Sequence, residues 1–322
     1  MKQNVSSRSS SFKKHLSWIR DLDRNASAPS SLSSDVGAIG RFQWYSGSFD
    51  YDTLAKINQS NVVECVIEDT LFKLQEKVQQ GPPSWVSTIR SAVSSYQLLS
   101  YLGLDRIDQR SGLDGLFHFP SSSGAGVNVY VIDTGINIEH TDFVGRASYG
   151  PSFIGNESDP TDTNGHGTFV AGVCCGECWK WAILSVAHRF PFRLHQPIGT
   201  NYGVAKKANV ISVKALNSDG SGRLSNVLAA LSWVVEQHTT SGNTSKTVVN
   251  LSLGAEYSEV TNNAIEQAIE QGIHFTIACN RKRRRRRVPV LARVRFHSDD
   301  GGGHQSRRLD RIVLKHGVLR RH

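Results

Sequence analysis

The sequence predicts an α/β protein with a doubly wound, mainly parallel sheet, preceded by a small α+β unit. Short apolar runs, of the kind that is buried on both faces of a parallel sheet, recur after Gly126. Helical stretches separate these runs, and the order strand, helix, strand implies right-handed crossovers. Functional residues are then expected at the carboxyl ends of the strands. The runs are Val127–Asp133, Val210–Leu216, Val248–Leu253 and Ile273–Ala278.

The first 110 residues have a different pattern, in which helical and strand-like stretches alternate. The helical stretches are Phe12–Leu22 and Tyr51–Asn58, and the strand-like ones are Phe42–Phe49 and Val62–Leu74. A Ser-rich linker is expected between the first helix and the first strand. This pattern fits an independent small domain.

Two helices are expected between the later apolar runs. The first follows the loop Gly220-Ser221-Gly222 and carries apolar residues at helical spacing. The second is Glu259–Gln271, which Gly272 ends. The apolar residues of the first helix are Leu224, Val227, Leu228, Leu231, Val234 and Val235.

The formal charge of +9 on the 322-residue chain is concentrated in its tail. Residues 281–322 hold 15 Lys and Arg against 3 Asp, which leaves 22 basic and 25 acidic side chains in residues 1–280. The body of the chain is therefore nearly neutral and gives no electrostatic reason to bind an anionic partner. A basic run such as Arg281–Arg287 usually marks a solvated tail, a nuclear-import signal or a nucleic-acid patch.

The spacing of the cysteines and the length of the apolar runs give no support for a zinc site, a disulfide framework or a membrane span. The five cysteines have no spacing that supports a zinc site or a disulfide framework. No apolar run approaches the length of a membrane span. Met1–Ser34 is Ser-rich and charged and lacks the apolar core of an export signal, so no signal peptide is visible in this chain.

Two residues carry the chemistry that the pattern indicates. Asp133 closes a buried strand, ahead of Thr134 and Gly135, which places a carboxylate at the carboxyl edge of the sheet. An isolated Asp in this position is usually a turn former. His166 stands between two glycines at the start of a small-residue helix, where other backbone can approach the ring. Together they fit the orienting acid and the general base of a Ser-His-Asp triad, in the chain order Asp, His, Ser.

Four blocks of the sequence, two of which contain Asp133 and His166, resemble a known family. They are VIDTGINIEHTDF (Val131–Phe143), NGHGTFVAG (Asn164–Gly172), YGVAKKANVISVKAL (Tyr202–Leu216) and NLSLG (Asn250–Gly254). In this order they resemble the subtilase family of serine endopeptidases, in particular its proteinase K and cerevisin branch. The resemblance implies a subtilisin-like fold, and it favours a folding prosegment over an independent domain for the first unit.

The resemblance also implies site roles. Asp133 is the histidine-orienting acid and His166 the general base, and Asn280 supplies the amide of the oxyanion hole, although Cys279 stands where the family has glycine. Two segments are expected to bind the substrate backbone as an added β-strand. They are Gly220, Ser221 and Gly222, and Ser252, Leu253 and Gly254.

The resemblance sets the expected domain boundaries. Residues 1–80 form a propeptide inhibitor-like domain whose first strand is missing, and residues 81–99 form a linker or processing region. Residues 100–280 form the peptidase domain, incomplete because residues 177–199 interrupt the family pattern, and residues 281–322 form the basic tail. SYLGLDRIDQR (Ser100–Arg110) resembles the start of a mature enzyme.

Two hypotheses explain where the pattern breaks. Residues 177–199 are either a surface insertion or a retained intron. The intron is favoured because Gly176-Glu177-Cys178 can be encoded by codons that contain a GTGAGT donor, and Ile198-Gly199 by codons that contain a TAG acceptor. After Asn280 a shift of one base permits the family blocks E-N-A-D-A, S-P-A-S, V-G-A-T and S-C-V-D in order, which favours a frameshift. No Gly-Thr-Ser-Met-like segment follows His166, so the nucleophilic serine is absent as written.

The resulting prediction is a serine endopeptidase of the subtilisin type, inactive as written. It acts on polypeptides, is inhibited by its own prosegment, is monomeric, binds neither nucleic acid nor membrane, and is secreted or vacuolar. No cofactor is required, and the family implies structural calcium without an assignable ligand set. The alternatives are a non-catalytic peptide-binding pseudoprotease and a nucleic-acid-binding or nuclear protein that uses the basic tail.

Overall fold

The computed structural model describes residues 10–24, 31–74, 104–108, 111–112, 117–143, 145–155, 158–175, 203–242, 245–255 and 257–278. The segments predicted as a retained intron and as a frameshifted tail lie outside these residues, as do Cys279 and Asn280.

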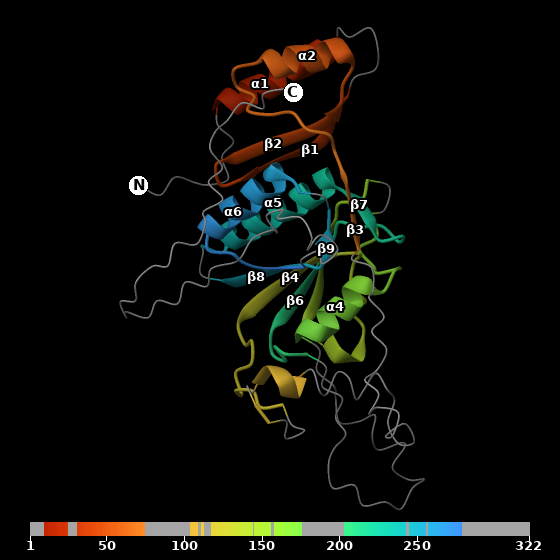
Figure 1. Cartoon of the computed structure of the whole chain (residues 1–322), viewed down its shortest axis with the longest axis vertical. Coiled ribbons are helices and arrows are strands. Elements are labelled where there is room, and N and C mark those ends of the chain that lie inside the picture. Colours follow the sequence, from red (N-terminus) through yellow and green to blue (C-terminus); the bar gives the residue numbers. More distant parts are fainter. Residues whose placement is uncertain are drawn as a thin grey trace, which may run out of the picture.

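A five-stranded sheet forms the centre of the molecule, in the order β10-β8-β4-β6-β5, and every neighbouring pair is parallel (Figure 1). The predicted parallel α/β sheet is thereby confirmed. β4 has the predicted bounds because its apolar run is buried in the middle of the sheet. The strands are β4 (Val127–Asp133), β5 (Ala147–Ser152), β6 (Asn209–Lys214), β8 (Lys246–Leu251) and β10 (His274–Ile277).

Helices cover both faces of this sheet, as a doubly wound fold requires. Tyr130 and Ile132 of β4 belong to the core shared with α5 (Leu224–Thr240) and α6 (Glu259–Glu270). Val129 and Val131 point the other way, into the core beneath α4 (His166–Cys175). This alternation places α4, with His166 at its first residue, on the face opposite the two long helices.

The N-terminal unit stacks on α5 and α6 (Figure 1). It contains α1 (Ser10–Arg24), the antiparallel pair β1 (Ser31–Ile39) and β2 (Phe42–Ser48), and α2 (Tyr51–Gln59), whose first turn is capped by Asp50. The stretch expected to be a Ser-rich linker is therefore partly a strand. Pairing with β2 and packing against α5 outweigh the weak strand propensity of its serines.

A small second sheet links this unit to the body of the molecule. β3 (Leu71–Leu74) lies between β7 (Ser221–Arg223) and β9 (Leu253–Gly254), antiparallel to both. The predicted strand Val62–Leu74 was too long, since only its last four residues meet pairing partners.

Candidate active site

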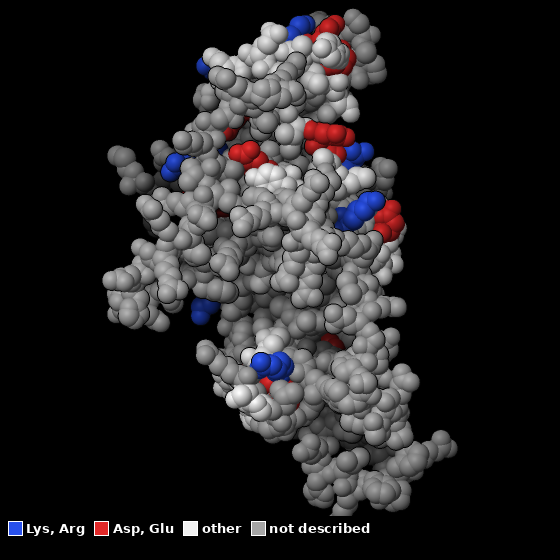
Figure 2. Space-filling model, in the orientation of Figure 1, with Lys and Arg blue, Asp and Glu red and all other residues white. Residues whose placement is uncertain are grey.

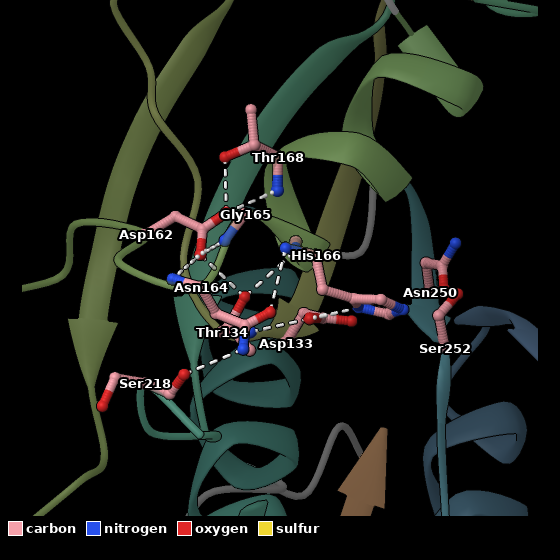
Figure 3. Close-up of polar contacts among 11 residues, drawn as sticks. Asp133, Thr134, Asp162, Asn164, Gly165, His166, Thr168, Ser218, Asn250 and Ser252 are labelled. Carbon is pink, nitrogen blue, oxygen red and sulfur yellow. Dashed lines mark hydrogen bonds and ion pairs between the residues drawn. The ribbon is translucent and has the colours of Figure 1, made fainter. Parts of the chain in front are cut away.

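Asp133 lies at the carboxyl end of β4 and is fully buried. One carboxylate oxygen, Oδ1, accepts a hydrogen bond from the Thr134 backbone N–H at 2.8 Å. The same oxygen lies 2.8 Å from Nδ1 of His166 (Figure 3). The structure thus brings together the two residues that the sequence singled out 33 positions apart.

His166 is the first residue of α4, and its side chain is 14% exposed. A carboxylate only accepts hydrogen bonds, so the contact with Asp133 puts the imidazole proton on Nδ1. Nε2 then carries the free lone pair, at the ring edge that is not held by Asp133. This tautomer can take a proton from a nucleophile, as a general base does.

The two glycines beside His166 have different reasons to be glycine. A Cβ on Gly167 would lie 2.1 Å from the Gly135 carbonyl oxygen, so the start of α4 packs directly on the backbone that follows Asp133. Gly165 has room around it, but its φ of +93° is a conformation that other residues rarely adopt. The sequence predicts that other backbone approaches beside both glycines, and a close approach is found at Gly167 alone.

Gly167→Ala is therefore expected to destabilise the fold by about 1–3 kcal/mol, because the helix start or the β4 end must move to admit the methyl group. Urea unfolding of the chain measures the effect. Gly172→Ala is the matched control on the same helix, since a Cβ there meets no atom within 4 Å. Unchanged stability of Gly167→Ala would contradict the packing described above.

The two predicted substrate-binding segments flank β3. Leu71, Phe72 and Lys73 pair with Arg223, Gly222 and Ser221, and Lys73 and Leu74 pair with Gly254 and Leu253. The Leu74 N–H also donates to the Gly220 carbonyl at 3.0 Å. Ser252 lies just before β9, and its hydroxyl donates to Oδ1 of Asn250 at 2.8 Å (Figure 3). An extended segment of this chain therefore lies between the two segments.

Glycine is required where β3 passes. Gly220 has a φ of +80°, and a Cβ there would lie 2.5 Å from Leu74. At Gly222 a Cβ would lie 2.1 Å from the Ala215 carbonyl oxygen. Gly220 therefore leaves room for the Leu74 side chain of β3, whereas Gly222 lets β7 pack directly on the backbone at Ala215.

Asp162 is a site residue that the sequence analysis missed. Burial alone would raise the pKa of its carboxyl, but hydrogen bonds from Thr168, Gly165 and Thr134 outweigh burial and hold the pKa below its usual value. The sequence did contain a signal, because an Asp two residues before Asn164 and three before Gly165 is typical of a turn held by its side chain.

Comparison with known proteins gives the family. The model of the family described as "Peptidase_S8: Subtilase family" matches residues 124–292, which include Asp133 and His166. This chain belongs to the subtilase family. Its predicted membership and its predicted class, a serine peptidase of the hydrolases, are thereby confirmed at the level of the family.

Individual relatives of this subtilase are fungal. The chain is 32% identical to "Subtilisin-like protease 1" of Trichophyton verrucosum and to that of Arthroderma benhamiae, each over 273 residues that make up 83% of this chain and 58% of the relative. It is 33% identical to "Subtilisin-like protease 1" of Trichophyton rubrum, over 83% of this chain and 46% of the relative. The chain thus spans about half the length of the curated relatives it matches.

Two solved structures are also similar to this subtilase. A "cold adapted subtilisin-like serine proteinase" is 36% identical, with a TM-score of 0.42 and coverage of 54% of each chain. "S41 Psychrophilic Protease" is 29% identical, with a TM-score of 0.37 and coverage of 48% of this chain and 45% of that structure.

Subtilases often bind structural calcium. Among the residues that the structure describes, no three His, Cys, Asp or Glu side chains gather closely enough to hold a metal ion. No ligands are therefore assigned. Within the same residues, none of the helices combines the length and the apolar character needed to cross a membrane.

Proposed function

We propose that this subtilase is built for the hydrolysis of peptide bonds, with Asp133 orienting His166 and His166 acting as the general base. The observation that carries the proposal is the 2.8 Å contact between the Asp133 carboxylate and His166 Nδ1. Two segments that can pair with an extended peptide flank the same edge of the sheet, which supports polypeptides as substrates. Asn280 is proposed to donate its amide to the developing oxyanion.

The chain as written is proposed to be inactive. Acyl transfer requires an attacking atom, and no serine in a Gly-Thr-Ser-Met-like segment follows His166. We define the frame-restored chain as the translation that omits codons 177–199, shifts the frame by one base after codon 280 and continues to the stop codon of that frame. The nucleophile is proposed to lie in this frame.

Residues 1–80 are proposed to be a prosegment that inhibits residues 100–280, with residues 81–99 as the linker that is processed. β3 pairs with the two segments proposed to bind the substrate backbone, and Phe72 is buried in the core of the body; both observations support an inhibitory prosegment. Asp69 accepts hydrogen bonds from the N–H and the hydroxyl of Ser225, at 2.9 and 2.8 Å, in the first turn of α5. A carboxylate at a helix N-terminus is stabilising, so these contacts hold the unit on the body.

Contacts of the β1–β2 pair with α5 and α6 add to this attachment. The indole N–H of Trp44 donates to the Ser232 hydroxyl on α5 at 3.0 Å, and the Arg41 N–H donates to Gln267 on α6 at 2.9 Å. A Cβ on Gly37 would lie 2.5 Å from the Ser232 hydroxyl oxygen, so the sheet of the unit packs directly on α5.

One alternative keeps a specific observation in its favour. A pseudoprotease that binds peptides without cleaving them would also seat β3 between β7 and β9. The nucleic-acid alternative depends on residues outside the described part of the chain, and on the face shown in Figure 2 the described acidic and basic side chains lie interspersed. We propose a monomer without nucleic-acid or membrane partners, either secreted or vacuolar.

Casein hydrolysis tests the proposal. The frame-restored chain is expected to cleave casein after prosegment removal, and the chain as written is expected to bind peptides at most. Transcript sequencing across codons 176–200 and 280 provides the independent check. Mature messages that retain codons 177–199 and the arginine frame would rule out the frame-restored chain and favour the pseudoprotease.

A further inference from the structure

Asp162 lies in the loop before α4 and is a centre of hydrogen bonds. Its Oδ1 accepts from the Asn164 N–H at 3.1 Å, the Gly165 N–H at 2.8 Å and the Thr134 hydroxyl at 2.8 Å. Its Oδ2 accepts from the N–H and the hydroxyl of Thr168 at 2.9 and 2.5 Å. A single half-buried carboxylate therefore accepts five hydrogen bonds, which only a group with two acceptor oxygens can do.

These donors lie within two residues of the proposed acid or base along the chain (Figure 3). Thr134 follows Asp133, and Gly165 precedes His166. The Thr134 hydroxyl oxygen also accepts from the Gly167 N–H at 3.0 Å, on the other side of His166. Asp162 thus ties the end of β4 to the first turn of α4 without touching the reacting groups themselves.

The loop that carries Asp162 is itself fixed to the sheet. The ammonium group of Lys214 donates to the Thr161 carbonyl at 2.9 Å, and Lys214 is a buried residue of β6 in register with Asp133. The side-chain amide of Asn164 donates to the Ser218 carbonyl at 2.8 Å. These contacts reduce the freedom of the loop, so the position of Asp162 is set by the sheet edge.

We propose that Asp162 is a positioning residue, which holds His166 in the orientation that bonds to Asp133. The inference rests on the proposed role of His166. The physical reason is that the backbone N–H groups at the start of α4 point toward a fixed anion, which determines where the helix begins. Asparagine has the same shape but replaces one acceptor oxygen by a donor, which would face the N–H groups of Gly165 or Thr168.

The test uses the full chain as written and observes His166 by NMR. The Nδ1–H that His166 donates to Asp133 is expected to give a low-field proton resonance, assigned by its loss in His166→Ala. Asp162→Asn is expected to lose this resonance. Asp159→Asn is the matched control, because Asp159 is an exposed residue of the same loop that accepts a hydrogen bond from the Thr161 N–H; it is expected to keep the resonance.

A second pair of variants covers the case in which Asp162→Asn does not fold, as judged by its thermal melting. Thr134→Val removes the hydroxyl that joins Asp162 to Gly167, and Thr134→Ser keeps a hydroxyl there. The valine variant is expected to lose the His166 resonance and the serine variant to keep it.

The outcomes distinguish a failure of the positioning role of Asp162 from a failure of the proposed role of His166. If folded Asp162→Asn keeps the resonance, the positioning role is overturned and the proposed function stands. If Asp162→Asn does not fold, the same conclusion follows when Thr134→Val keeps the resonance. Absence of the resonance from the folded, unaltered chain would overturn the proposed role of His166 and this inference with it.

Discussion

Replacing Asp133 by asparagine in the frame-restored chain is expected to lower the rate of casein hydrolysis about 10⁴-fold, the loss seen when the corresponding change is made in serine proteases. An asparagine side chain can turn its NH₂ group toward Nδ1 of His166. The imidazole proton then moves to Nε2, which is the atom that has to accept the proton of the nucleophile. The expected loss is in turnover more than in substrate binding, since Asp133 lies buried beneath the base.

Asp159→Asn is the control for this prediction as well, because Asp159 is exposed and lies in the loop that leads to His166. Its hydrolysis rate is expected to stay close to that of the unaltered frame-restored chain. Equal rates for the Asp133 and Asp159 variants would show that the buried carboxylate does not orient the base.

Phe72→Ala is expected to weaken inhibition by the prosegment by about 10²-fold to about 4 × 10³-fold, because removing a buried phenylalanine side chain costs about 3–5 kcal/mol and each 1.4 kcal/mol is about tenfold in affinity. Phe72 is buried in the core of the body and pairs with Gly222 of β7, whereas its neighbour Leu71 is 54% exposed. The measurement is the inhibition constant of the released prosegment, residues 1–80, against the processed frame-restored enzyme.

Leu71→Ala is the matched control on the same strand, and it is expected to change the inhibition constant little. If both variants inhibit as well as the unaltered prosegment, β3 does not occupy the substrate groove during inhibition. If neither the unaltered prosegment nor the variants inhibit, the proposed role of residues 1–80 is wrong.

The sequence predicts best where the signal is local. The run that ends at Asp133 is apolar throughout because it is buried on both faces, and β4 has the bounds that this run predicts. The glycines around His166 and the strand-end position of Asp133 are likewise local features. They were sufficient to single out two residues that the structure places in contact.

The sequence predicts poorly where a distant partner determines the structure. Ser31–Ile39 becomes a strand because β2 and α5 provide its neighbours, which its own serines do not indicate. Val62–Leu74 is rich in β-branched residues, but only Leu71–Leu74 meets β7 and β9. The role of Asp162 is also tertiary, because Thr134 reaches it from another part of the chain.

Labelling with a fluorophosphonate probe tests the central claim most directly, since such probes react with a serine that a neighbouring base has activated. The account predicts that one serine of the processed frame-restored chain is labelled, that His166→Ala abolishes the labelling, and that the chain as written is not labelled. Labelling that persists without His166, or no labelling of a folded, processed frame-restored chain, would contradict it.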